Sequence, residues 1–229
     1  FAVCNYLELY HRTHNAAYKE LAVRLVNQVH DVLGRHRADD PRKGWISGLS
    51  EKEGTLHPTI GGLRIGKKLN ERKLGEPFDE RLEWDQDGQY FHYLTKWMHT
   101  LNRVSRVTRD PVYIRWAVDL AKTAHARFTY VPAAGGTKKM VWKMSIDLSY
   151  PLVPSMGMHD PLDGLVTYSE LQMMADTIPE PLPALRDEIA DMTDICRGRN
   201  WLTDDPLGIG GLLFDASRIA QLMVQVGFD

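Results

Sequence analysis

A short acidic and aromatic segment, Glu83-Trp84-Asp85-Gln86-Asp87, is the part of this sequence best equipped for chemistry. Aromatic rings can bind the C–H faces of sugars, and carboxylates can bind their hydroxyl groups. Hydrolysis of a glycosidic bond needs two carboxyl groups, one as acid and one as base or nucleophile. Asp85 or Asp87 could supply one member of that pair. The structural alternative is that Asp87 caps the helical pattern that follows it.

A second group of candidates lies between residues 155 and 164, in the segment that contains His159 and Asp163. A histidine outside a helix can act as acid, base or hydroxyl ligand, so His159 is a candidate catalytic residue. Asp163 could provide the second carboxylate. Asp160 is expected to cap a helix instead, because Pro161 follows it and proline suits the first helical turn.

The substrate itself would be held by further side chains from the predicted loops. Tryptophan usually fills the core of a helical protein, yet four of the six tryptophans fall outside the helical patterns, which favours a ligand cleft. Arg64 and Lys67, beside the glycine-rich residues 61–66, could bind an anionic group such as a uronate. The glycines of this stretch do not have the spacing of a Walker phosphate loop. The predicted substrate-binding residues are His57, Arg64, Lys67, Trp84, Trp142 and Trp201.

Composition and spacing exclude several other classes of protein. The 28 basic and 30 acidic residues give a net charge of −2, which argues against a dedicated nucleic-acid binder. No run of about 18 apolar residues is present, so no membrane span is expected. The histidines show neither HxH nor HExxH spacing, so we expect no metal and no cofactor. Two distant cysteines and no visible signal peptide favour the cytoplasm.

Hydrophobic periodicity predicts six helices and one region of strand. The helices cover residues 5–33, 89–108, 111–128, 161–173, 183–196 and 206–226, and the strand region covers 139–148. Asp-Pro pairs at 110, 160 and 205 mark three helix starts. Because short turns make neighbouring helices antiparallel, the three long connections should emerge together at one end. Long structured loops in a compact domain are usually functional, so the candidate residues are expected there.

These elements predict an all-α fold of stacked antiparallel helical hairpins, a partial or complete (α/α) toroid with long loops and a short β-hairpin at one end. We expect one domain over residues 1–229. With Glu83–Gly88 and His159–Gly164 as suggestive segments, this layout resembles the six-hairpin glycosidase superfamily, whose sugar 2-epimerases and unsaturated glucuronyl hydrolases are arranged similarly. The resemblance implies acidic and aromatic residues at one mouth of the barrel.

A full toroid has twelve helices, and six are predicted, so the chain is expected to be part of a larger ring. Helix faces left open would be covered by a missing segment or by a second copy in a homo-oligomer. The leading functional hypothesis is a carbohydrate-active enzyme that uses paired carboxylates to hydrolyse a glycosidic bond in a saccharide, with anionic saccharides among the candidate substrates.

Two alternatives remain open at this point. A sugar epimerase or isomerase would use His159, and His57 with it, as proton-transfer bases. A non-catalytic scaffold would bind proteins along the concave face of a helical repeat. Such scaffolds usually have short loops and a recurrent consensus, neither of which this sequence has.

Overall fold

The computed structural model describes residues 1–226, most of which form helices. The helices within those residues are α1 (Ala2–Thr13), α2 (Ala16–Leu33), α3 (Glu51–Leu56), α4 (Glu80–Asp85), α5 (Phe91–Thr108), α6 (Pro111–Phe128), α7 (Asp160–Ala175), α8 (Arg186–Cys196) and α9 (Pro206–Val226). The strands are β1 (Gln89–Tyr90), β2 (Thr129–Tyr130), β3 (Lys139–Met140), β4 (Lys143–Met144) and β5 (Pro151–Val153). The predicted helical class is confirmed.

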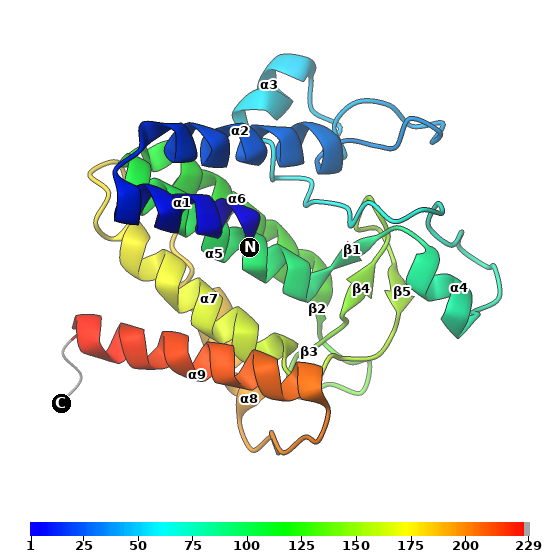
Figure 1. Ribbon diagram of the computed structural model, residues 1–229. Coiled ribbons are helices and arrows are strands. Elements are labelled where there is room, and N and C mark those ends of the chain that lie inside the picture. The colour runs from blue at the N-terminus through cyan, green and yellow to red at the C-terminus, as the bar shows by residue number, and fades with distance from the viewer. Residues whose placement is uncertain (227–229) are drawn as a thin grey trace.

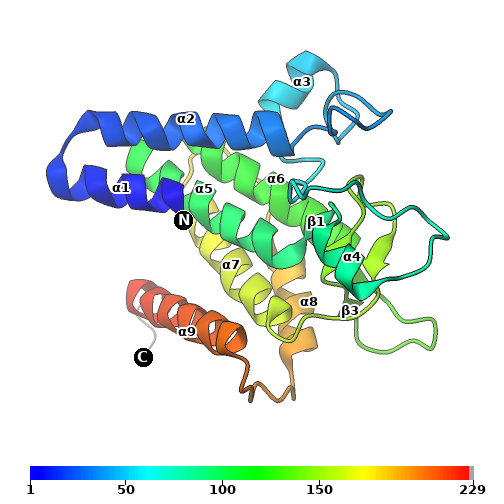
Figure 2. The same cartoon turned by 45° about the vertical axis from the view of Figure 1, so that its right-hand side comes forward.

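The long helices form a row of hairpins (Figure 1). α1 packs against α2, α5 against α6, and α7 against α8, while α1, α5, α7 and α9 follow one another as neighbours. α1 and α9 therefore lie at the two ends of the row (Figure 2). This arrangement agrees with stacked antiparallel hairpins, whereas closure into an (α/α) toroid stays a prediction.

The first predicted helix, over residues 5–33, is wrong because the structure divides it into α1 and α2. His14 ends α1 in the left-handed conformation, with φ of 54°. Asn15 then begins α2, and its side chain accepts a hydrogen bond from the backbone N–H of Ala17 at 3.0 Å. Asparagine is a strong N-cap, but the apolar spacing continues through this two-residue break, so periodicity alone does not reveal it.

The predicted strand region of residues 139–148 is also interrupted. β3 pairs with β2, whereas β4 lies in a separate antiparallel sheet of order β1-β4-β5. In that sheet Gln89 lies opposite Met144, and Lys143 lies opposite Val153. The small sheet therefore ties the segment before α5 to the segment before α7.

The core lies between the helices of neighbouring hairpins. Phe91 begins α5 and packs edge-on against Phe128 at the end of α6, with ring centroids 5.5 Å apart. Further fully buried side chains of α5 and α6 continue this contact along both helices: Leu94, Met98, Leu101, Ile114, Ala117 and Ala121. Truncating such a leucine to alanine typically costs about 2–5 kcal/mol of stability.

The long connections gather at one end of the row, as the sequence predicts. The segments before α5, α7 and α9 all lie on the side of the sheet, whereas the connections after α1, α5 and α7 lie at the opposite end (Figure 1). The N-termini of α5, α7 and α9 consequently open toward the same loops. Candidate residues from distant parts of the chain can meet there.

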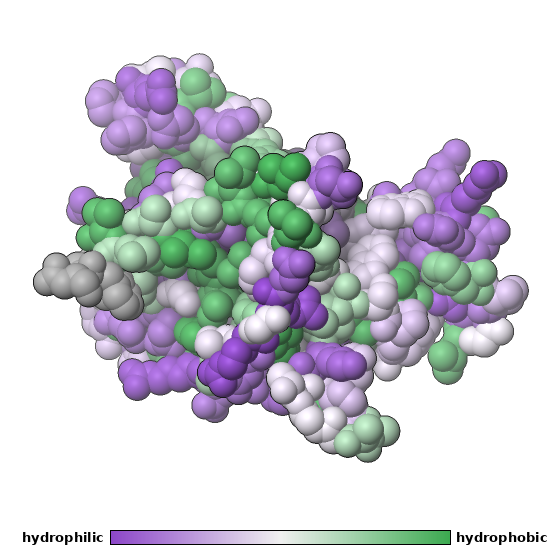
Figure 3. Space-filling model, turned by 90° about the horizontal axis from the view of Figure 1, so that it is seen from below, coloured by the Kyte–Doolittle hydropathy of each residue, from purple (hydrophilic) through white to green (hydrophobic). Residues whose placement is uncertain are grey.

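The outward side of α9 is apolar and exposed. Leu207, Leu213 and Val224 keep 84%, 66% and 84% of their surface exposed. Hydrophobic residues gather on this face in the view from below (Figure 3). This agrees with the open helix faces expected from the sequence, while a homo-oligomer or a further segment as the cover stays a prediction.

α9 is also, within residues 1–226, the one helix whose length and composition would allow it to cross a membrane. The window from Pro206 to Val224 has a mean hydropathy of 1.3 and is 17% buried. A single helix of this kind is weak evidence for a membrane span, and Asp215 and Arg218 on its inner side are buried. The expected cytoplasmic location, without membrane or nucleic-acid partners, stays a prediction.

Candidate functional site

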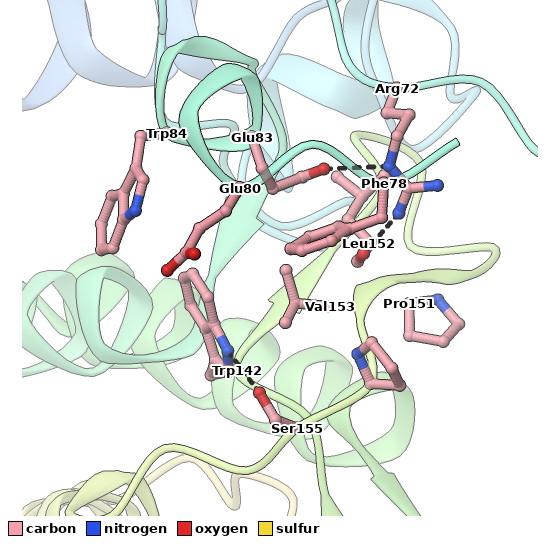
Figure 4. Close-up of a pocket in the computed structure, with 11 residues that line it drawn as sticks. Arg72, Phe78, Glu80, Glu83, Trp84, Trp142, Pro151, Leu152, Val153 and Ser155 are labelled. Carbon is pink, nitrogen blue, oxygen red and sulfur yellow. Dashed lines mark hydrogen bonds and ion pairs between the residues drawn. The ribbon is translucent and has the colours of Figure 1, made fainter. Parts of the chain in front are cut away.

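A cavity of about 890 Å³ lies beside the small sheet, at the end of the molecule where the long loops gather (Figure 4). Three segments build it: α4 with the loop before it, the residue before β4, and β5 with the loop after it. The lining residues are Arg72, Phe78, Glu80, Glu83, Trp84, Trp142, Pro151, Leu152, Val153, Pro154 and Ser155. Most of this lining is apolar, with a few polar groups, as is usual for small-molecule sites.

Two tryptophans form one wall of the cavity: Trp84 from α4 and Trp142, the residue before β4. The rings of Trp84 and Trp142 have centroids 5.9 Å apart and planes inclined by 35°. The indole N–H of Trp142 donates a hydrogen bond to Ser155 Oγ at 3.0 Å, which fixes the orientation of that ring. Trp84 is 55% exposed. Both rings were predicted to bind substrate, and the fold brings them together.

Two carboxylates of α4 also line the cavity, on the same face because they are three residues apart. Glu80 is exposed, makes no hydrogen bond or ion pair with residues 1–226, and extends toward the two indole rings in Figure 4. Glu83 is buried, and its carboxylate lies 2.9 Å from Arg72 Nε and 2.7 Å from Lys143 Nζ. One carboxylate is therefore free for a ligand, and the other is held.

Lys143 is fully buried and fixes α4 to the sheet. Its ammonium donates hydrogen bonds to the backbone carbonyls of Glu83 at 2.6 Å and Gln86 at 3.1 Å. Burial lowers the pKa of Lys143, and the neighbouring Glu83 carboxylate opposes that shift. Arg72 completes the arrangement by donating to the carbonyl of Leu152 at 2.5 Å. Glu83 is thus a positioning residue, since both of its cations bind backbone at the cavity wall.

A row of aromatic rings continues from the cavity toward the N-terminus of α5. Trp142 packs against Tyr90 with centroids 5.1 Å apart, and Tyr90 packs against His92 and Tyr93 at 5.6 and 5.2 Å. Tyr90 is buried, whereas Tyr93 is 49% exposed. The row therefore extends an exposed aromatic surface beyond the cavity.

Asp87 is the predicted catalytic residue whose surroundings differ most from expectation. Its carboxylate is fully buried and accepts hydrogen bonds from Arg64 Nη1 at 3.0 Å and from the backbone N–H of Gly66 at 2.8 Å. Arg37 lies 3.4 Å away. Asp87 does not cap α5. This geometry assigns Asp87 and Arg64 to an internal ion pair, away from the lining of the cavity.

Asp163 is also buried in an ion-pair network and does not line the cavity. Lys96 Nζ and Arg218 Nη1 lie 2.8 and 3.0 Å from its Oδ1, and Thr95 donates to its Oδ2. Burial alone would raise the pKa of Asp163, but Lys96 and Arg218 hold it below the ordinary value. The network joins α5, α7 and α9.

The other predicted site residues are spread over the loop end. Asp85 is exposed at the end of α4, and Lys67 is partly exposed. His57 Nδ1 lies 3.3 Å from Asp119 on α6, and Trp201 packs beside the Arg199 guanidinium at 6.0 Å. None of these four lines the cavity.

His159 lies at the start of α7, packs against Gly208 of α9, and does not line the cavity. Its Nδ1 is buried without a hydrogen-bond partner in the described part of the chain. Within that part, no group of three or more metal-ligating side chains gathers.

The sequence predicted Asp85 and Asp87 as catalytic acids, whereas the acids that line the cavity are Glu80 and Glu83. Glu80 and Glu83 belong to a short helix that Asp79 caps, since its Oδ1 accepts from the N–H of Leu82 at 2.9 Å. Asp79 followed by Glu83 was a usable sequence signal for that helix, because acidic side chains near its N-terminus stabilise a helix. Arg72, far from the acidic segment, had no such signal.

Comparisons with known proteins add nothing to this geometry. No protein-family model matches the chain, and neither a curated protein nor a solved structure matches it. The functional assignment therefore depends on the arrangement of the side chains.

Proposed function

We propose that this chain is a carbohydrate-active enzyme that hydrolyses a glycosidic bond of a saccharide bound in the cavity between α4 and the sheet. The observation that carries the proposal is the pair of tryptophans, Trp84 and Trp142, beside the free carboxylate of Glu80. Indole faces can pack on the apolar faces of a sugar ring, while a carboxylate accepts hydrogen bonds from its hydroxyls. This combination favours a saccharide over a purely apolar ligand.

Glu80 is the carboxylate proposed to take part in the reaction. It extends into the cavity and has no cation beside it among residues 1–226. It can accept the proton of the attacking water as that water bonds to the anomeric carbon. Glu83, with its charge balanced by Arg72 and Lys143, keeps α4 and therefore Glu80 in place.

The charge of the cavity favours a neutral saccharide. Among the described residues, Arg72 is the cationic side chain that lines the cavity, and its guanidinium is already paired with Glu83. Arg64, which was expected to bind an anionic group, is paired with Asp87. An added uronate would meet the unpaired carboxylate of Glu80, while the lining cation Arg72 is already bonded to Glu83, so repulsion from Glu80 would weaken its binding.

The test is turnover of a panel of neutral 4-nitrophenyl glycosides and of xylo-, cello- and arabino-oligosaccharides, with new reducing ends as the readout. Trp84→Ala and Trp142→Ala should each raise KM about 10–100-fold, because each removes a stacking surface worth on the order of 1–3 kcal/mol. Glu80→Gln should lower kcat at least about 100-fold.

Matched controls are available on the same chain. Tyr130 is an exposed aromatic residue and Glu20 an exposed acid, and neither lines the cavity, so Tyr130→Ala and Glu20→Gln should behave as wild type. Equal KM values in the tryptophan variants would refute the saccharide site. Binding without new reducing ends would support a non-catalytic scaffold, and an isobaric sugar product would support an epimerase.

A further inference from the structure

Asp160 is a buried carboxylate whose position in the sequence does not explain its surroundings. Three helices begin with Asp-Pro. Asp110 caps α6 by accepting from the N–H of Val112 at 2.9 Å, and Asp205 accepts from the N–H of Gly208 at the start of α9 at 2.7 Å. The side chain of Asp160 makes no such bond, although it was expected to cap α7. Its Oδ2 has no hydrogen-bond partner among residues 1–226, and the residue is only 6% exposed.

His92 lies beside Asp160 and reaches the surface. Its Nδ1 lies 3.9 Å from Asp160 Oδ1, and the histidine side chain is 40% exposed whereas that of Asp160 is 8% exposed. This separation is longer than a hydrogen bond. Catalytic hydrogen bonds are often long before substrate binds. His92 also belongs to the aromatic row that begins at the cavity, through Tyr90.

We propose that His92 and Asp160 form a proton relay that delivers a proton to the leaving oxygen of the saccharide bound along the aromatic row. This inference rests on the proposed function, because it supplies the acid that Glu80 needs as its partner. His92 is the catalytic residue, since its ring reaches the surface, and Asp160 is the positioning and proton-supplying residue behind it.

The relay balances without a further reactant. As the glycosidic C–O bond breaks, the leaving oxygen takes the proton from His92 Nε2. In the same step His92 Nδ1 takes the proton from the Asp160 carboxyl, which leaves Asp160 as a carboxylate and His92 neutral, with its proton now on Nδ1. The attacking water gives its proton to Glu80 and its hydroxyl to the anomeric carbon. Solvent then protonates His92 Nε2 while the Nδ1 proton returns to Asp160, and Glu80 loses its proton to solvent.

The charged groups around the pair are consistent with this direction of transfer. Burial, and to a smaller extent the Asp163 charge, raise the pKa of Asp160 to about 7, with Lys96 opposing. Burial lowers the pKa of His92 to about 4, so its ring is neutral at pH 7 and can accept at Nδ1. On the α9 side, Asp215 and Arg218 join the same network through Asp163. Below pH 7 the carboxyl group of Asp160 is therefore protonated, and it can supply a proton to His92.

The decisive experiment combines pH–rate profiles with NMR of the His92 ring. In wild type, kcat/KM on the glycoside panel should fall as pH rises through about 7, because Asp160 then loses its proton. Asp160→Asn should lower kcat about 10–100-fold and abolish that limb of the profile, while Trp84-dependent binding of the oligosaccharides is retained. Asp110→Asn is the matched control, since it removes a capping carboxylate in the same Asp-Pro context, and it should keep the limb.

The NMR measurement separates this inference from the proposed function. The ring nitrogen shifts of His92 should change with a midpoint near pH 7 in wild type and lose that change in Asp160→Asn, whether or not a glycoside is cleaved. A wild-type-like pH profile in Asp160→Asn, or a His92 ring that does not respond between pH 6 and 8, would overturn the relay. Loss of tryptophan-dependent binding alone would overturn the saccharide site.

Discussion

Arg218 on α9 forms a two-pronged ion pair with Glu170 on α7, with its Nε and Nη2 donating at 3.0 and 2.7 Å to the two carboxylate oxygens. Both side chains are buried, and Arg218 Nη1 also reaches Asp163. Burial would raise the pKa of Glu170, but hydrogen bonds from His99 and Arg218 lower it to about 2. The contact between the last helix and its neighbour is therefore largely ionic on this face.

Replacing Arg218 should release α9 from α7. In Arg218→Met the carboxylates of Glu170 and Asp163 lose a buried cation, which typically costs about 3–5 kcal/mol. Amide hydrogen exchange should speed up across residues 206–226 more than in α5. Arg197→Ala, which removes an exposed cation paired with Asp194, should change stability by less than about 0.5 kcal/mol. Unchanged exchange in α9 would show that apolar contacts hold the helix.

Asp87 should stabilise the folded protein through its buried ion pairs. Asp87→Asn leaves Arg64 and Arg37 without their buried anion, so the free energy of unfolding should fall by about 3 kcal/mol or more in urea titrations. The exposed Asp85 has no such partner among residues 1–226, so Asp85→Asn should leave the free energy of unfolding nearly unchanged. An Asp87→Asn protein of wild-type stability that lacks turnover would restore the catalytic role that the sequence predicts.

Two glycines of α9 should respond oppositely to alanine. Nothing lies within 4 Å of a Cβ placed at Gly210, so Gly210→Ala should stabilise the helix by about 0.5–1 kcal/mol. A Cβ at Gly208 would collide with the ring of His159, so Gly208→Ala should destabilise it. Circular dichroism melts and hydrogen exchange of α9 distinguish the two signs, and equal effects would contradict the packing of His159.

His30 should make stability depend on pH. Burial lowers its pKa to about 4, and its Nε2 accepts a hydrogen bond from Trp97 Nε1 at 3.0 Å. Because the unfolded chain binds the proton more readily between pH 4 and 6.5, this group makes stability rise with pH across that window by up to about 1.4 kcal/mol per pH unit and stay level above it.

The contribution of His30 is isolated by the difference in the free energy of unfolding between wild type and a His30 variant at each pH. In His30→Gln the glutamine oxygen can still accept from Trp97, but the titrating group is gone, so the wild-type minus variant difference should decline as pH falls from 6.5 to 4. Asp160 and Asp215, whose pKa values burial raises to about 7, have the opposite slope and cancel in this difference. His11→Gln, at an exposed position, serves as the control for replacing a histidine by glutamine.

Local patterns in the sequence predicted most of the helices and the end of the molecule at which the loops gather. Asp110-Pro111 marks the start of α6 as expected, because a capping carboxylate and a proline act within one turn. The break at His14-Asn15 escaped prediction, since it depends on the backbone of two residues inside a continuous apolar pattern. Trp84 and Trp142 were predicted to bind substrate because they fall outside the predicted helices, although the structure places Trp84 in the short helix α4.

The chemical identities of the residues, the helical periodicity and the approximate loop lengths were determined by the sequence itself. Only the tertiary structure decided which acid is free and which is paired. The sequence alone does not distinguish the chemical roles of Asp87 and Glu80. In the fold, Arg64 pairs with Asp87, whereas Glu80 extends into the cavity beside Trp142. The partner of a charge comes from segments distant in the chain, so burial and pairing, which set whether a carboxylate can act, are properties of the packed fold.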